Sequence, residues 1–290
     1  MEIKHIVKQM SITVRDFLET EGYSRNFRKN VRLQDIVFVN GRPVRNHEIL
    51  HQGDEVIIIP QETLNPVFLS NIRPLEVIYE DEYLLIINKP SGFSTQPSLK
   101  HPTDNMISMI TSYYHQHHIS SNIHVLTRLD YRTTGMMIVA KSGVIHQKMM
   151  MQHVTKKYLC WILGTLDPEE GIICLPIHYI KSHDIRRWVD PDGQRALTKY
   201  KTLETQPLKS LLEIELLTGR THQIRVHMAH LGHPVIGDNL YDNQEGDLLL
   251  HCYQLTFIHP ITNLEINLTN YPEWVVENKT KNENINGNNH

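Results

Sequence analysis

The chain has 290 residues, and at about 150 residues per domain this length predicts one large domain or two unequal ones. A hydrophobic content of 40% and a charged content of 21% are close to globular averages and exclude disordered and fibrous proteins. No apolar run approaches the roughly 20 residues of a membrane-spanning helix, and the first residues do not resemble a secretory signal. Three widely separated cysteines exclude a disulfide framework and a cysteine zinc site, so we expect a cytoplasmic protein.

The total charge conceals a local cluster of basic residues. Lysine and arginine number 29 against 32 aspartate and glutamate, and a net charge of −3 is not typical of a general nucleic-acid binder. Between residues 22 and 47, however, the only acid is Asp35. The basic residues of this stretch are Arg25, Arg28, Lys29, Arg32, Arg42 and Arg45. The sequence therefore predicts a small basic module attached to a mildly acidic body.

Residues 1–60 are predicted to form that module. Apolar residues at helical spacing predict a helix around residues 14–18, and a second helix is expected from Ser24 toward Val31. An apolar strand at 36–39 runs into Asn40-Gly41, the strongest short signal of a β-hairpin.

A polar, proline-containing stretch at 61–74 is interpreted as a linker, and residues 75–277 as a second, larger domain. In that domain, apolar strands are expected near residues 84–87, 136–140, 158–163 and 212–216. A helix is expected over Thr221–Leu231, ending at Gly232. Strands and helices do not alternate regularly, which favours an α+β fold over a doubly wound sheet. The asparagine-rich residues 278–290 are expected to be a disordered tail.

The first candidate for chemistry is the segment Thr127–Gly135. Asp130 stands two residues from Arg128 and two from Arg132, and an aspartate between guanidinium groups stays ionised well below neutral pH. Such a carboxylate suits a nucleophile or an electrostatic stabiliser. A charged surface turn with solvated ion pairs accounts equally well for the spacing alone.

The second candidate is the segment Leu217–His227, where a polar turn enters the expected helix. An arginine at Arg225 on a rigid helix is a good fixed partner for a carboxylate, and His222 accompanies it. A capped amphipathic helix with polar surface residues is the alternative interpretation. Tyr158 opens an apolar strand and is suited either to cross-strand packing or to base stacking and proton transfer.

We predict neither a metal site nor a cofactor site. His227, His230 and His233 are spaced at three, but Gly232 and Pro234 should end the helix before the third imidazole. The sequence also has no glycine-rich phosphate loop, no nucleophile elbow and no Cys-x-x-Cys motif.

Taken together, these motifs resemble the RluA-type family of RNA pseudouridine synthases over residues 11–274. The matching segments are Arg128–Asp130 with Thr133–Gly135, Thr218–His227 and Leu231–Asp238, with weaker matches at Asn88–Gly92 and Lys157-Tyr158. Residues 1–60 resemble the alpha-L RNA-binding domain, through Ser24-Arg25, Arg28, Val39–Gly41 and Gly53-Asp54. The resemblance implies an α+β fold with a mixed, largely antiparallel sheet, flanking helices and a central active-site cleft.

The resemblance also implies a role for individual residues. Asp130 matches the nucleophile that isomerises uridine to its C-glycoside, and Arg225 matches the arginine that pairs with it. Tyr158 matches the tyrosine that packs on the target base, and Arg128 matches the residue that fills the space left by the flipped uridine. Substrate contacts are expected from Thr133, Arg220 and His222, and RNA-backbone contacts from Arg25, Arg28, Lys29 and Arg32.

An isomerisation needs no cofactor, so the expected partner is RNA, ribosomal rather than transfer RNA, acted on by a monomer. The sequence departs from the family pattern at Thr127, where histidine is usual, and at Thr134, where serine is usual. It departs again at Leu33–Asp35, which replaces a glycine-containing turn. Two other functions fit the same residues: a non-catalytic RNA-binding or ribosome-assembly factor, and a hydrolase that excises the base.

Overall fold

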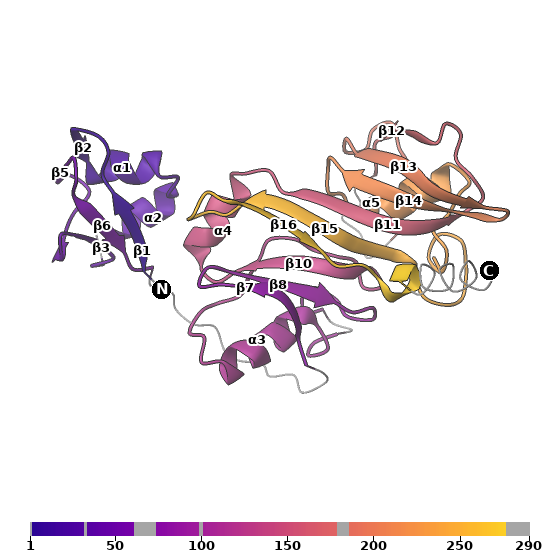
Figure 1. Ribbon diagram of the computed structural model, residues 1–290, viewed down its shortest axis with the longest axis horizontal. Helices are drawn as coiled ribbons and strands as arrows, with labels where there is room; N and C mark the ends of the chain where they lie inside the picture. The colour runs from indigo at the N-terminus through magenta and orange to yellow at the C-terminus, as the bar shows by residue number, and fades with distance from the viewer. Residues whose placement is uncertain (1, 32–33, 61–73, 99–100, 179–185, 277–290) are drawn as a thin grey trace, which may run out of the picture.

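The computed structural model describes residues 2–31, 34–60, 74–98, 101–178 and 186–276 (Figure 1). Its helices are α1 (Val14–Thr20), α2 (Arg25–Asn30), α3 (Met106–Gln116), α4 (Gly143–Met150) and α5 (Gln223–His230). The strands of the first 60 residues are β1 (Ile3–Ile6), β2 (Ser11–Thr13), β3 (Val37–Val39), β4 (Arg42–Pro43), β5 (Ile49–His51) and β6 (Glu55–Ile58). The later strands are β7 (Glu76–Glu80), β8 (Leu84–Lys89), β9 (His124–Val125), β10 (Thr134–Ala140), β11 (Thr155–Leu163), β12 (Glu170–Cys174), β13 (Leu197–Gln206), β14 (Lys209–Leu216), β15 (Leu250–Ile258) and β16 (Glu265–Thr269).

The N-terminal elements form their own sheets. Strands β1, β6, β3 and β4 make a four-stranded antiparallel sheet, and β2 pairs with β5. Both predicted helices are present, and each begins where a hydroxyl side chain, Thr13 or Ser24, accepts a backbone N–H of the first turn. The predicted hairpin is also confirmed, with Asn40 at φ 49° and Gly41 at φ 81° between β3 and β4.

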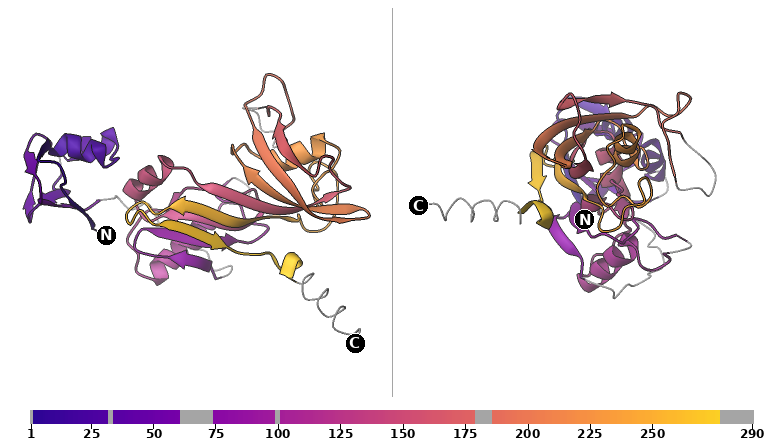
Figure 2. Two further views of the ribbon diagram at one scale, coloured as in Figure 1. Left: turned by 45° about the horizontal axis from the view of Figure 1, so that its top comes forward. Right: turned by 90° about the vertical axis from the view of Figure 1, so that its right-hand side faces the viewer.

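The rest of the chain is built on one large sheet with the order β12-β13-β14-β11-β15-β10-β8-β7. Strand β16 pairs with β15, and β9 pairs with β10. Neighbouring strands are antiparallel except β10 and β15, which run parallel over a short stretch. Helix α3 lies beneath the β7–β8 end of the sheet, and α5 lies with β12–β14 at the other end (Figure 1; Figure 2). The expected α+β fold with a mixed, largely antiparallel sheet is confirmed.

The N-terminal elements contact the large sheet through α4. The Lys148 ammonium donates to the Glu21 carbonyl at 2.7 Å and lies 4.7 Å from the centre of the Tyr23 ring. The side chain of Met151 lies beside Gly22. These contacts bring the end of α1 and the start of α2 against the C-terminal end of α4.

Helix α5 is shorter than the sequence predicts, since it begins at Gln223 rather than Thr221. The Gln223 side chain accepts the backbone N–H of Arg220 and the hydroxyl of Thr218 in the preceding turn. His222 then takes a left-handed conformation, with φ 56°, which cannot continue a right-handed helix. The turn held by Gln223 and the left-handed His222 therefore set the start of the helix, which the apolar spacing alone placed two residues too early.

The parallel contact between β10 and β15 depends on Gly135. This residue has φ 111°, and a Cβ there would collide with the backbone of Cys252, its partner on β15. Backbone cannot move aside as a flexible side chain can, so the glycine permits a close approach that no other residue allows.

We therefore expect Gly135→Ala to lower the free energy of unfolding by about 3 kcal/mol or more, measured by urea titration. Gly219→Ala is the matched control, because no atom lies within 4 Å of its added Cβ. That variant should stay within about 1 kcal/mol of the wild type. Equal stability of the two variants would contradict the packing argument.

His251 on β15 gives the fold a dependence on pH. Its ring lies between the Thr134 hydroxyl, at 2.7 Å from Nδ1, and the Asn270 carbonyl, at 3.0 Å from Nε2. Burial lowers the pKa of His251 to about 4 in the folded chain. In the unfolded chain the imidazole becomes protonated near pH 6.5, so between these two pH values only the unfolded chain binds the proton. Stability is therefore lost as the pH falls from about 6.5 toward 4.

For His251→Gln, which keeps polar contacts but does not titrate, we expect the loss of stability between pH 7 and pH 5 to shrink by about 2 kcal/mol. Urea unfolding at the two pH values measures this difference. An unchanged loss in the variant would show that other groups carry the pH dependence.

Candidate active site

A cleft of about 400 Å³ opens where the start of β10, the start of β11 and the entry to α5 meet. This volume suits a nucleoside-sized ligand. The cleft is lined by Thr95, Gln96, Leu126–Asp130, Thr133, Lys156, Tyr158, Leu216, Gly219–Arg225 and Leu250. The sequence candidates Arg128, Asp130, Thr133, Tyr158, Arg220, His222 and Arg225 are all among them.

Asp130 lies on a turn whose backbone is held from several sides. Its carbonyl accepts the backbone N–H of Thr133 at 3.2 Å. The preceding residue, Leu129, exchanges two hydrogen bonds with the Thr95 hydroxyl, and the next carbonyl, that of Tyr131, accepts Lys89 Nζ at 3.1 Å. The Asp130 side chain is 24% exposed and faces the cleft. The geometry is that of a fixed carboxylate at the wall of a ligand site, rather than a solvated surface turn.

Lys89 is a residue that the sequence interpretation included only as part of a weak motif. It is fully buried at the end of β8, and its ammonium also donates to the Pro90 carbonyl at 2.8 Å. Burial lowers the pKa of Lys89 to about 7, and the nearby charge of Asp130 opposes this shift. A charged residue that closely follows the apolar run at 84–87 is the sequence signal that could have singled out Lys89.

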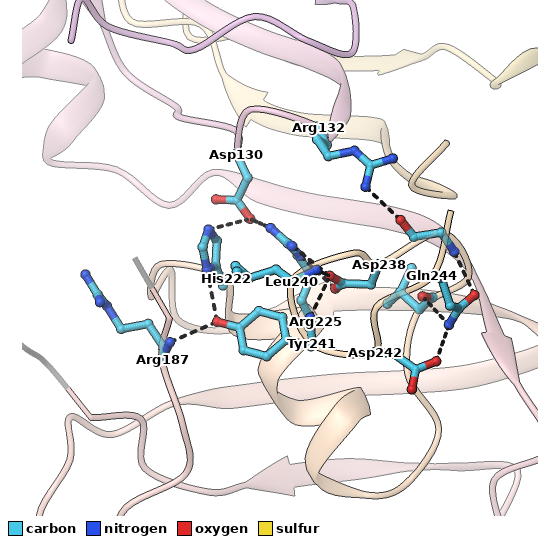
Figure 3. Close-up of polar contacts among 12 residues, drawn as sticks. Asp130, Arg132, Arg187, His222, Arg225, Asp238, Leu240, Tyr241, Asp242 and Gln244 are labelled. Carbon is cyan, nitrogen blue, oxygen red and sulfur yellow. Dashed lines mark hydrogen bonds and ion pairs between the residues drawn. The ribbon is translucent and has the colours of Figure 1, made fainter. Parts of the chain in front are cut away.

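Arg225 has two carboxylate neighbours at different distances (Figure 3). Its Nε and Nη2 each donate to Asp238 at 2.8 Å, whereas its Nη1 lies 3.7 Å from Asp130 Oδ2. The sequence interpretation paired Arg225 with Asp130 alone. The structure places Arg225 beside both carboxylates and makes Asp238 the partner with bidentate geometry.

Asp238 is fully buried, and its carboxylate holds two backbone groups in addition to the Arg225 guanidinium. Its Oδ1 also accepts the backbone N–H groups of Leu240 and Tyr241 at 3.0 and 3.2 Å. Burial acts to raise the pKa of Asp238, but the Arg225 guanidinium and these N–H groups hold it below its ordinary value. Asp238 was quoted in the sequence only as the last residue of a motif, with no role assigned.

His222 connects Asp130 to Tyr241. The His222 Nε2 atom lies 3.9 Å from Asp130 Oδ2, and its Nδ1 lies 3.0 Å from the Tyr241 hydroxyl (Figure 3). The Tyr241 hydroxyl in turn accepts the backbone N–H of Arg187 at 3.0 Å. Burial lowers the pKa of His222, although Asp130 opposes the shift, so the imidazole is neutral at neutral pH.

Tyr158 lies in the wall of the cleft at 5% exposure. Tyr158 lies opposite Cys252 on the neighbouring strand β15, with its hydroxyl beside the Cys252 thiol. Burial raises the pKa of Tyr158 well above its ordinary value, so the phenol keeps its proton. Tyr158 is therefore a neutral phenol in the wall of the cleft.

The remaining cleft residues differ in exposure. Arg128 and Arg220 are exposed at the rim, whereas the Thr133 hydroxyl is buried and has no hydrogen-bond partner among the described residues. A buried hydroxyl in a ligand cleft is available to a substrate. Thr127, which stands where the family usually has histidine, accepts the backbone N–H of Ile138 at 2.8 Å with its hydroxyl oxygen.

Three of the four basic residues expected to contact RNA, Arg25, Arg28 and Lys29, lie on α2 and outside the cleft. Arg25 and Lys29 are exposed one helical turn apart. Arg28 is largely covered, with a side chain 15% exposed, and forms an ion pair with Glu19. Arg32 lies outside the described residues.

Two of the three histidines of the considered metal cluster, His227 and His233, have separate partners. His227 is buried between the Thr198 hydroxyl and the Leu175 carbonyl, and His233 Nδ1 lies 2.9 Å from the Leu163 carbonyl. Within the part of the chain that the structure describes, no three histidine, cysteine or acidic side chains are grouped to hold a metal ion. The described helices also include none that is long and apolar enough to cross a membrane.

Residues 83–230 match the family model described as RNA pseudouridylate synthase. A Bacillus subtilis protein, "Uncharacterized RNA pseudouridine synthase YjbO", is 34% identical over 265 residues, covering 87% of this chain and 92% of the relative. The chain belongs to the RluA-type family of RNA pseudouridine synthases. It is therefore an isomerase that acts on RNA.

Two further similarities agree with this family. "Ribosomal large subunit pseudouridine synthase D" of Yersinia pestis is 29% identical over 266 residues, covering 84% of this enzyme and 82% of the relative. The structure of "Human RNA Pseudouridylate Synthase Domain Containing 4" aligns with a TM-score of 0.57, covering 69% of this enzyme and 90% of that chain. At 24% sequence identity, this alignment shows a shared fold.

Because Arg225 is paired with both Asp238 and Asp130, the structure predicts the effect of Asp238→Asn. The change keeps an oxygen for the backbone N–H groups but leaves the Arg225 charge buried with only Asp130 to neutralise it. We expect kcat to fall at least about 10-fold, because the guanidinium shifts toward Asp130, and the unfolding free energy to drop by about 3 kcal/mol.

Asp81→Asn is the matched control for this variant. Asp81 also accepts two consecutive backbone N–H groups, of Tyr83 and Leu84, but lies at the opposite end of β8 from Lys89. The Asp81→Asn enzyme should have a lower free energy of unfolding than the wild type and an unchanged kcat. Steady-state turnover and urea unfolding of both variants give the comparison, and an equal loss of kcat in the two would refute a specific role for Asp238.

Proposed function

We propose that Asp130 is the nucleophile of a uridine isomerisation and that the target uridine, flipped out of its RNA, occupies the cleft around it. The observation that carries this proposal is the fixed Asp130 carboxylate in a nucleoside-sized cleft. It lies next to the buried Arg225, which is also paired with Asp238. An RNA helix does not expose the glycosidic bond to such a group, so the nucleotide must leave the stack.

In the proposed reaction, the bond between N1 of uracil and C1′ of ribose breaks with the assistance of Asp130. The uracil turns within the cleft, and a bond forms between its C5 and C1′. The proton on C5 is lost and N1 gains one, so the atoms of substrate and product balance. No electrons are exchanged and no group donor takes part.

The other cleft residues support distinct parts of this reaction. Tyr158, as a buried and protonated phenol, provides a flat surface against the uracil ring. The Thr133 hydroxyl is free to hydrogen-bond the nucleotide, and Arg225 limits the movement of Asp130. Exposed Arg128, two residues before Asp130, is suited to enter the space that the flipped uridine leaves, because a planar cation can both stack and hydrogen-bond.

We further propose that the substrate is ribosomal RNA. A relative that covers most of this chain is named for the large ribosomal subunit. The exposed Arg25 and Lys29 on α2 supply basic side chains for a phosphate backbone, away from the cleft that receives the base.

The test is release of tritium from large-subunit ribosomal RNA labelled at C5 of uridine, with Asp130→Asn beside the wild type. We expect release by the wild type and at least about 10⁴-fold slower release by the variant, because the chemical step loses its nucleophile. RNA binding by the two proteins should be similar, since the variant retains the shape of the side chain.

The alternatives give different products. Free uracil and an abasic site would identify a base-excising hydrolase. Tight binding without release from any cellular RNA would favour a binding factor. Release by Asp130→Asn at the wild-type rate would remove Asp130 from the chemistry while leaving the isomerase assignment intact. Release from transfer RNA alone would overturn the ribosomal target.

A further inference from the structure

An aromatic pair stands outside the cleft, on the segment that precedes β13. The rings of His178 and Trp188 are stacked, with centroids 4.5 Å apart and planes within 10° of parallel. Trp188 is nonetheless 44% exposed, whereas Trp161 in the sheet is 1% exposed. One face of the Trp188 indole is therefore covered by His178, and its other face is open to solvent.

A single carboxylate contacts both rings. Asp190 Oδ2 accepts the Nδ1–H of His178 at 2.8 Å, and the Trp188 side chain lies beside the same carboxylate. Its Oδ1 accepts the backbone N–H of Asp192, and the backbone N–H of His178 donates to the Trp188 carbonyl at 2.9 Å. The orientation of the indole is thus fixed before any ligand arrives.

The pair is anchored to the element that carries the active-site arginine. Val189 packs in a small cluster with Val226 on α5 and with Tyr241. The residue on the other side of Trp188, Arg187, donates its backbone N–H to the Tyr241 hydroxyl. The Tyr241 hydroxyl is hydrogen-bonded to His222, whose other ring nitrogen faces Asp130. Figure 3 shows Arg187 beside these residues. Trp188 is therefore placed relative to the nucleophile by a short chain of defined contacts.

Exposed arginines accompany this position in the chain. Arg186 precedes Trp188 by two residues and Arg195 follows it by seven. The Arg220 side chain, at the rim of the cleft, donates its Nε–H to the Arg195 carbonyl at 3.1 Å. Rigid aromatic rings together with arginines are the combination with which proteins hold unpaired nucleotides, since the ring stacks on a base and the cations contact phosphates.

We propose that the open face of Trp188 stacks on an unpaired nucleotide of the substrate RNA, one that flanks the target uridine, with Arg186 and Arg195 contacting its phosphates. This subsite rests on the proposed function, because it needs the uridine in the cleft. A stacked base beside the cleft holds the strand open while the uridine is flipped, so the site contributes to affinity for the RNA rather than to bond breaking.

The first test compares Trp188→Ala and Trp188→Phe in the tritium-release assay on ribosomal RNA. The subsite predicts that KM rises about 10-fold for Trp188→Ala, returns to within about 3-fold of the wild type for Trp188→Phe, and that kcat changes less than 2-fold in both. An aromatic ring with no RNA contact would leave KM unchanged. That result, or a fall in kcat at constant KM, would overturn the proposal.

The second test does not depend on the stability of the alanine variant. Intrinsic fluorescence is titrated with ribosomal RNA in Asp130→Asn, which binds without turnover, because a base stacked on indole quenches its emission. Quenching should persist when Trp274→Phe is added and disappear when Trp188→Phe is added. Trp274 is the matched control, since it packs against the cluster of Trp161 and Tyr253. Equal quenching in both double variants would overturn the subsite.

The two proposals fail separately. A wild-type enzyme that releases no tritium from any RNA contradicts the proposed function itself. An active wild type whose KM and quenching are insensitive to Trp188 contradicts only the subsite and leaves that surface to a protein partner.

Discussion

One arginine between two carboxylates is the constraint on which this active site depends. Arg225 and Asp238 are almost completely buried, and a buried charge without a partner costs several kcal/mol. The loop that contains Asp238 must therefore lie against α5 in every folded molecule. Because Asp238 takes the bidentate face of the guanidinium, Asp130 keeps a longer contact of 3.7 Å. A carboxylate with two short charged hydrogen bonds is a poor nucleophile. Asp130, with its longer contact to Arg225, is therefore more reactive than Asp238.

The large sheet gives this arrangement its rigidity. Strands β8 and β10 are buried along nearly their whole length, and the proposed nucleophile, Asp130, lies in the turn that leads into β10. Tyr158 comes from β11 and lies opposite Cys252 on β15, two strands joined by backbone hydrogen bonds. Side chains from distant parts of the sequence are thus fixed by regular secondary structure, which holds functional groups more accurately than loops do.

Local patterns predicted the parts of this structure that are decided locally. Helical spacing predicted α1 and α2, Asn40-Gly41 predicted the hairpin, and the irregular order of elements predicted α+β. The sequence also selected Asp130 and Arg225, which the fold brings into one cleft, whereas their roles came from the family resemblance. It missed the partnership with Asp238 and the hydrogen bond from Arg187 to Tyr241, because these depend on how segments far apart in sequence approach one another.

Arg132 shows what such a preassembled site means for binding. Its guanidinium donates to the carbonyls of Gly237 and Gly246, so the turn that carries Asp130 is joined to both ends of the loop that carries Asp238. Two segments more than 100 residues apart then move as one body. The conformational entropy of ordering them is lost when the chain folds, not when RNA arrives. In the proposed reaction, the free energy of RNA contacts is consequently left for distorting the RNA as the target base leaves its stack.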